Sequence, residues 1–145
     1  MDIDGLRRKA EAGSVVAQTI LGICYLDGLD VEQDYHAAFQ LLSSASKHGV
    51  SRARVNLARM YREGLGIRRN FAQAIQLYEA AAKAGEFLAQ IELARIYSRG
   101  VSVTPDLDSA RRWYQAAVAQ EQTIGSCPEL VEARAFLSKS QSADG

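Results

Sequence analysis

The sequence has few of the features that would tie the chain to a disulfide framework, a membrane or a nucleic acid. Only 2 of its 145 residues are cysteine, too few for a domain held together by disulfides. Lys and Arg number 17, as do Asp and Glu, so the formal net charge is zero. A neutral chain has no bulk attraction for nucleic acid or anionic lipid. Because no apolar run is long enough for a signal peptide or a membrane span, we expect a cytoplasmic protein, unless a leader has been removed.

Recognisable catalytic and metal-binding patterns are also missing. His36 and His48 have no carboxylate or cysteine beside them at metal-ligand spacing. The glycines of EGLGIRRN follow no strand, so they do not form a phosphate-binding loop. No nucleophile motif of the G-x-S-x-G kind occurs. We therefore expect no enzymatic activity, no cofactor and no metal.

What the chain does contain is a repeat with a period of 36 residues. Four sets of identical residues fall into this register: Ala17, Ala53 and Ala89; Leu21, Leu57 and Leu93; Tyr25, Tyr61 and Tyr97; Gly28, Gly64 and Gly100. A fixed period of this length is typical of repeat proteins, in which each unit buries its apolar face only against its neighbours.

Each unit contains the signals of two helices. In the first unit an amphipathic stripe that includes Leu21 and Tyr25 predicts a helix near 14–27, and Gly28 stops it. Asp34 is placed to cap a second helix near 35–48, and Asn70 and Asp106 occupy the equivalent positions. We therefore interpret the chain as one domain, 1–145. It has an N-terminal capping helix at 4–13, repeats at 14–49, 50–85 and 86–121, a loop at 122–128 and a C-terminal capping helix at 129–139.

The repeat resembles the Sel1-like repeat, a relative of the tetratricopeptide repeat. The first unit carries the matching residues Ala17, Leu21, Gly22, Tyr25, Gly28, Val31, Asp34, Ala38, Ala45 and Gly49. The third carries the Trp-Tyr pair of the pattern at Trp113 and Tyr114, where the first has Leu41 and Leu42. The resemblance implies an all-α fold, a solenoid of antiparallel helix pairs wound as a right-handed superhelix. It also implies a protein–protein interaction module of the kind used in bacterial signalling or secretion.

By analogy with tetratricopeptide units, the first helix of each pair lines a concave face that binds a partner protein. The side chains predicted to point into this groove are Val16, Ile23, Leu26, Arg52, Val55, Arg59, Arg62, Ile91, Arg95 and Arg99. Arginine forks bind carboxylates in bidentate fashion and are enriched in interface hot spots. The hypothesis is that the groove receives an acidic and partly apolar segment of another protein, and that the chain is a monomer.

Three alternatives remain open at this stage. The arginines could be solvated side chains that pair with their own neighbours Glu63 or Glu92. The module could be an immunity-type inhibitor of a cognate toxin or effector instead of an adaptor. Nucleic-acid binding is a minor alternative, because no exposed aromatics are predicted among the basic residues.

Overall fold

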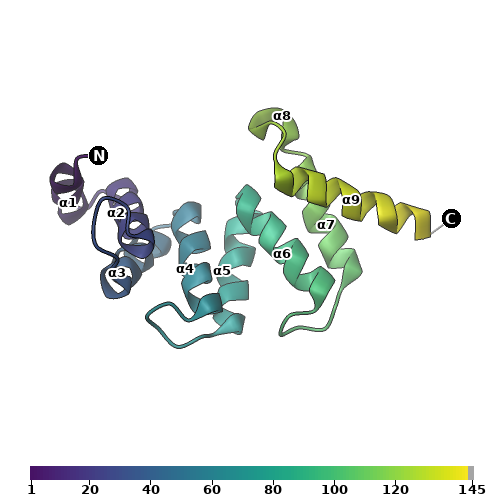
Figure 1. The fold of residues 1–145 in the computed structure, drawn as a ribbon, viewed down its shortest axis with the longest axis horizontal. Coiled ribbons are helices and arrows are strands. Elements are labelled where there is room, and N and C mark those ends of the chain that lie inside the picture. Colours follow the sequence, from purple (N-terminus) through teal and green to yellow (C-terminus); the bar gives the residue numbers. More distant parts are fainter. Residues whose placement is uncertain (144–145) are drawn as a thin grey trace. The chain divides into compact units, whose positions relative to one another are not determined.

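A computed structural model describes the backbone of residues 1–143 and the side chains of residues 1–139. All regular structure in that part of the chain is helical, as the sequence predicted (Figure 1). The helices are α1 (Ile3–Glu11), α2 (Val15–Asp27), α3 (Tyr35–Lys47), α4 (Ser51–Glu63), α5 (Phe71–Lys83), α6 (Phe87–Arg99), α7 (Leu107–Val118), α8 (Glu121–Ile124) and α9 (Pro128–Ala143).

The chain divides into two compact units, and the boundary falls inside α5. Unit 1 comprises Met1–Ala81 and unit 2 comprises Ala82–Gly145. Each unit contains helix pairs in the order that the 36-residue register predicts. The interpretation of the whole chain as one domain stays a prediction.

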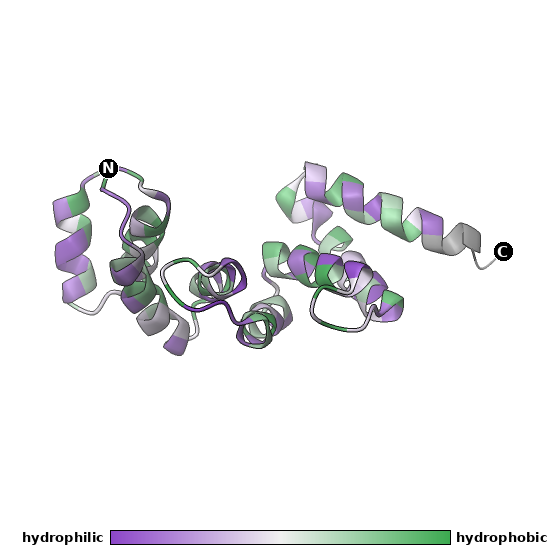
Figure 2. Cartoon of the chain, turned by 60° about the horizontal axis from the view of Figure 1, so that its bottom comes forward, coloured by the Kyte–Doolittle hydropathy of each residue, from purple (hydrophilic) through white to green (hydrophobic). Residues whose placement is uncertain are grey.

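Unit 1 is built by each helix packing on the next. α1 packs on α2, α2 on α3, and α3 on α4. Figure 2 shows α1, beside the N-terminus, as largely hydrophilic. At the centre of the unit lie Leu26, Leu42 and Met60, each no more than 1% exposed. Removing a side chain of this size from water stabilises the fold by about 1.5–3 kcal/mol.

The ends of the helices follow the predicted capping chemistry. The carboxylate of Asp34 accepts a hydrogen bond from the Ala37 N–H at 3.0 Å, and Asn70 and Asp106 make the equivalent contact to Gln73 and Ser109. Gly28, Gly64 and Gly100 follow the first helices with φ of 69–70°, a left-handed conformation that is cheap only for glycine. The predicted spans 14–27 and 35–48 are therefore correct to within one residue.

Unit 2 differs from the prediction at its C-terminal side. α9 begins at Pro128 and continues to Ala143, beyond the predicted 129–139, and it packs on α7. The rings of Tyr114 and Phe136 meet there with centroids 4.9 Å apart. The predicted loop at 122–128 instead opens with α8, because the Gln120 carbonyl accepts the N–H groups of Thr123 and Ile124. An ion pair between Arg134 and Glu121 links this turn to α9.

Candidate protein-binding surfaces

The first helices of unit 1, α2 and α4, lie against each other and present part of the predicted groove. We call this surface the α2–α4 face and define it by Val16, Ile23, Arg52, Val55 and Arg59. Val16 is 64% exposed and Arg52 is also exposed, whereas Ile23, Val55 and Arg59 are half-buried. The face therefore offers apolar and cationic side chains to solvent.

Two of the predicted groove residues are core residues instead. Leu26 is 1% exposed and packs with Leu42 and Met60. Ile91 is 0% exposed and packs with Tyr114 and Ala133. The prediction was wrong for both, because α4 covers this side of α2 and α9 covers the corresponding side of α6. Neither side chain can reach a partner without unfolding.

Two arginines of α4 are already engaged with carboxylates. The Arg59 guanidinium donates to Asp27 of α2 at 2.5 Å. Arg62 donates to Glu63 at 2.9 Å and lies 5.8 Å from the centroid of the Tyr78 ring. These pairs reduce the positive potential that the sequence suggested. The Arg52 guanidinium has no ion-pair partner among the described residues.

Arg95, in unit 2, is held within its own unit. It donates two hydrogen bonds to Glu132 of α9, at 2.8 and 3.0 Å, and one to Glu92 at 2.8 Å. The Tyr114 hydroxyl donates to the same Glu132 carboxylate at 2.9 Å. Arg95 therefore fastens α9 to α6, and its pairing with Glu92 is one that the alternative interpretation of the sequence anticipated. Arg99 is exposed and has no ion pair in the described part of the chain.

The pKa values in this cluster follow from the same contacts. Hydrogen bonds from Arg95 hold the pKa of Glu132 below its usual range. The hydrogen bond to Glu132 raises the pKa of Arg95 in turn. Burial, followed by the hydrogen bond to Glu132, raises the pKa of Tyr114 to about 12. At neutral pH the Glu132 carboxylate is therefore ionised and the Tyr114 hydroxyl keeps its proton, so the hydrogen bonds of this cluster persist.

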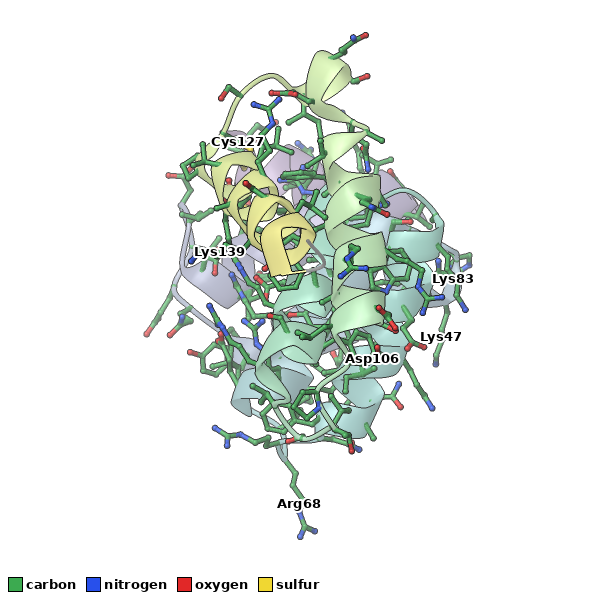
Figure 3. The ribbon with its side chains drawn as sticks, turned by 90° about the vertical axis from the view of Figure 1, so that its right-hand side faces the viewer. Lys47, Arg68, Lys83, Asp106, Cys127 and Lys139 are labelled. Atoms are coloured by element: carbon green, nitrogen blue, oxygen red, sulfur yellow. The ribbon has the colours of Figure 1, made fainter. Side chains whose placement is uncertain are left out.

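A second basic surface, which the sequence analysis missed, lies in the loop before α5. A hollow of about 460 Å³ is bordered by Phe39, Tyr61, Ile67, Arg68, Arg69 and Asn70. Arg68 extends away from the helices (Figure 3), and no described residue forms an ion pair with it. The signal was present in the repeat register, because Arg68 and Arg69 occupy the positions of Glu32 and Gln33 in the first unit.

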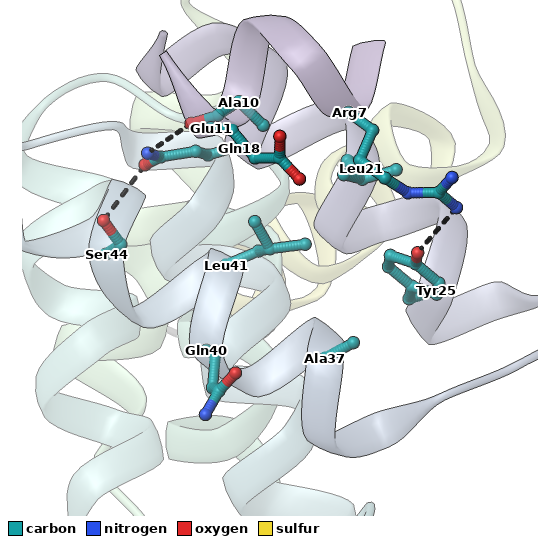
Figure 4. Close-up of a pocket in the computed structure, with 10 residues that line it drawn as sticks. All are labelled: Arg7, Ala10, Glu11, Gln18, Leu21, Tyr25, Ala37, Gln40, Leu41 and Ser44. Atoms are coloured by element: carbon teal, nitrogen blue, oxygen red, sulfur yellow. Dashed lines mark hydrogen bonds between the residues drawn. The ribbon is translucent and has the colours of Figure 1, made fainter. Parts of the chain in front are cut away.

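A cavity of about 330 Å³ lies between α1, α2 and α3 of unit 1 (Figure 4). Its apolar part includes Leu21 and Leu41. Its polar edge includes Arg7, which donates to the Tyr25 hydroxyl at 3.0 Å, and Gln18, which donates to the Ala10 carbonyl at 3.2 Å. The sequence analysis did not anticipate a cavity here, because it treated Leu21 and Leu41 as ordinary packing residues.

No group of three or more His, Cys, Asp or Glu side chains among the described residues is arranged to hold a metal ion. No helix within 1–143 combines the length and apolar character needed to cross a membrane.

Comparison with known proteins identifies the repeat. The Sel1 repeat matches three segments, residues 15–50, 51–86 and 88–121. The chain belongs to the Sel1 repeat family. The family resemblance and the all-helical solenoid fold predicted from the sequence are therefore confirmed. Sel1 repeats are generally protein–protein interaction modules and act as scaffolds without catalysis.

Solved structures of the family share this fold. The chain resembles the crystal structure of a Sel1 repeat protein from Oxalobacter formigenes, with a TM-score of 0.76 and 34% identity over 95% of this chain and 98% of that one. It also resembles c5321, described as a protective antigen of uropathogenic Escherichia coli with an SLR fold, with a TM-score of 0.75 and 27% identity over 98% of this chain. Because only 34% of c5321 is covered, this chain corresponds to about a third of that protein. The curated proteins contain no match to the sequence.

Proposed function

We propose that this protein binds a partner protein through the α2–α4 face, and that the partner contributes an acidic and partly apolar segment. One observation carries the proposal. Exposed side chains on the first helices differ from repeat to repeat, although the scaffold residues of those repeats are the same. Val16, Arg52 and Leu88 share one repeat position, whereas the neighbouring position is alanine in all three repeats. A position that the scaffold leaves free is where specificity for a partner can reside.

The chemistry of the face supports this kind of partner. The unpaired Arg52 guanidinium can take a carboxylate in bidentate fashion. Val16 and the exposed part of Val55 offer aliphatic surface beside it. Arg59 contributes less, because Asp27 already accepts from it at 2.5 Å and a partner carboxylate would have to displace that pair.

Within this function the module is an adaptor or scaffold, of the kind used in bacterial signalling or secretion. The second use is an immunity-type inhibitor that covers a cognate toxin or effector. Affinity capture followed by calorimetry separates the two. A single partner bound one-to-one with a nanomolar Kd supports the inhibitor, and weaker binding to several proteins supports the adaptor.

The surface is tested by charge reversal on matched positions. We expect Arg52→Glu to weaken binding of the captured partner at least about tenfold, since an unpaired arginine at an interface commonly acts as a hot spot. Lys47→Glu, an exposed change of the same charge on α3, should change the Kd less than about twofold. Val16→Ser should weaken binding, whereas Val131→Ser, 62% exposed on α9, should not.

Equal effects of Arg52→Glu and Lys47→Glu would show that the partner responds only to net charge, and the α2–α4 face would be rejected.

The salt dependence of oligonucleotide binding tests the minor alternative, nucleic-acid binding. A Kd for a generic oligonucleotide that weakens steeply with salt would favour nucleic-acid binding over protein binding.

A further inference from the structure

The loop between α2 and α3 carries an exposed apolar residue beside two carboxylates. Leu29 is 48% exposed, and Asp30 and Glu32 are exposed close behind it. Neither carboxylate has an ion-pair partner among the described residues. Gln33 fixes the loop to α2, because its Nε2 donates to the Leu26 carbonyl at 2.8 Å. The loop therefore presents a short acidic and partly apolar segment that the fold holds in place.

The hollow before α5 has the opposite charge. Phe39, Tyr61 and Ile67 are half-buried and form its apolar wall. The rings of Phe39 and Tyr61 meet edge to face, with centroids 6.0 Å apart. Arg68 and Arg69 are exposed at the rim, and no described residue forms an ion pair with either. Arg68 points away from the helices in Figure 3. The hollow therefore combines an apolar wall with two cationic groups.

The repeat register shows that the two loops are equivalent parts of the scaffold. Glu32 corresponds to Arg68, and the third repeat has the uncharged Thr104 at this position. Asp30 corresponds to Gly66, and their φ angles are 59° and 69°. This left-handed conformation is cheap only for glycine. The scaffold therefore requires neither the acidic residues of the first loop nor the arginine of the second.

The two loops are neighbours within unit 1. Gly66 of the second loop lies against Tyr35, the first residue of α3, so closely that a Cβ added to Gly66 would come within 2.4 Å of the Tyr35 Cβ. Tyr35 and Ile67 also pack against the same core. Within residues 1–139 no ion pair joins the two loops, so their charges are available to another molecule. A copy related by a twofold axis can meet both loops at once, because each loop of one copy then faces the other loop of its partner.

We propose that two copies of the chain associate reciprocally through these loops. Leu29 of each copy enters the hollow of the other, where Asp30 and Glu32 pair with the two rim arginines. The formal net charge of zero means that repulsion between whole molecules does not oppose association. Exposed ion pairs orient the encounter but contribute little energy. With one aliphatic anchor on each side, the contact is weak, and we expect a Kd on the order of 10–100 µM.

This dimer replaces the monomer expected from the sequence, and it does not depend on the α2–α4 face. Sedimentation equilibrium of the full-length protein measures it directly. We expect a monomer–dimer equilibrium that stops at the dimer. Arg68→Glu with Arg69→Gln should weaken dimerisation at least about tenfold, and Asp30→Gly with Glu32→Arg should do the same. Each double variant takes its residues from the equivalent loop of the other repeat, which already accommodates them, so folding is not at risk.

Mixing the two double variants tests the pairing of the loops. One variant has two basic loops and the other has two acidic loops, so neither associates with itself but each complements the other. We expect the mixture to form a heterodimer with about the wild-type Kd. Adding Leu29→Ser to the variant with basic loops leaves its net charge unchanged and should weaken the heterodimer at least about fivefold. Adding Val101→Ser, 40% exposed in the equivalent loop of the third repeat, should change the Kd less than about twofold.

A wild-type protein that stays monomeric at ten times the expected Kd would overturn the proposal. A mixture that fails to associate would do so as well. If Leu29→Ser leaves the heterodimer as tight as before, the attraction follows from net charge alone and the docking of the loop is rejected. Growth beyond the dimer would reject the reciprocal arrangement. If the wild type is monomeric and a captured partner slows hydrogen exchange in both loops, the hollow belongs to that partner and the dimer is rejected.

Discussion

Glu132 connects two helices of unit 2 through a single carboxylate. It accepts hydrogen bonds from Arg95 of α6 and from the Tyr114 hydroxyl of α7. Its side chain is 36% exposed, so solvent screens part of the attraction. The contribution of the cluster to stability is accordingly modest, but its dependence on pH has a definite sign.

Acid should loosen α9 through Glu132. The folded pKa of Glu132 lies below its unfolded value of about 4.3, so the stabilisation is complete above that value and is lost as pH falls through the folded pKa. The pKa of Tyr114 is raised to about 12 from about 10, so its contribution is present below pH 10 and lost as pH rises through 12. Between about pH 4.3 and about pH 10 we expect the contribution of this cluster to stability to change little. The fluorescence of Trp113, the single tryptophan, reports on the neighbouring core.

The matched variants are both on α9. Glu132→Gln should remove the acid-side change in Trp113 fluorescence, because it has no proton to take up. Glu129→Gln should retain that change. An acid transition of the same size in both variants would place its origin outside this cluster.

The contacts of Arg95 could not have been predicted from the repeat. The register correctly placed Arg95 on a first helix, equivalent to Arg59. Glu132, however, lies beyond an irregular segment that shifts α9 eight residues out of register. Because the pairing of the two depends on how that segment folds, sequence spacing alone predicted a groove-facing arginine.

Two first helices of the repeats, α4 and α6, lack a side-chain cap at their N-terminus. Ser14, Asp34 and Asp106 cap α2, α3 and α7 by accepting a backbone N–H. α4 and α6 have Val50 and Glu86 at the N-cap position and no side-chain cap. Ser14 occupies the same repeat position as these two residues, so its local geometry is compatible with a serine there.

Glu86→Ser should therefore stabilise the protein. A serine cap contributes about 1 kcal/mol, and the loss of a glutamate near the positive end of α6 offsets about 0.3 kcal/mol or more of this. We expect a net gain of about 0.5 kcal/mol in the free energy of unfolding, measured by urea denaturation. Ser14→Ala should lower it by about 1 kcal/mol. A loss of stability in Glu86→Ser would mean that its carboxylate makes a larger contribution than the missing cap.

Local signals explain which helices the sequence predicted well. The ends of α2 and α3 depend on Ser14, Gly28 and Asp34, which act within a few residues of where they stand. α8 depends on Gln120 and on the contact of Glu121 with Arg134, which has no sequence signature. The cavity in unit 1 belongs to the same class, because the residues that line it come from three helices and form no motif in the sequence.

For the molecule as a whole, the repeat architecture predicts that stability is built from neighbouring contacts. Leu42 is 0% exposed within the core of unit 1, and Leu130 is 1% exposed on α9 of unit 2. Replacing a buried leucine by alanine destabilises its surroundings by about 2–5 kcal/mol. In a chain of repeats this loss falls mainly on the unit that contains the mutation and on its neighbours.

Hydrogen exchange should therefore separate the two units. We expect Leu42→Ala to accelerate exchange in α2–α4 at least about tenfold more than in α7 and α9, since 1.4 kcal/mol already corresponds to a factor of ten. Leu130→Ala should show the reverse pattern. Equal acceleration throughout the chain in both variants would mean that the 145 residues unfold as one cooperative unit. If each variant instead accelerates exchange mainly in its own unit, a partner bound to α2 and α4 can stabilise unit 1 without slowing exchange in α9.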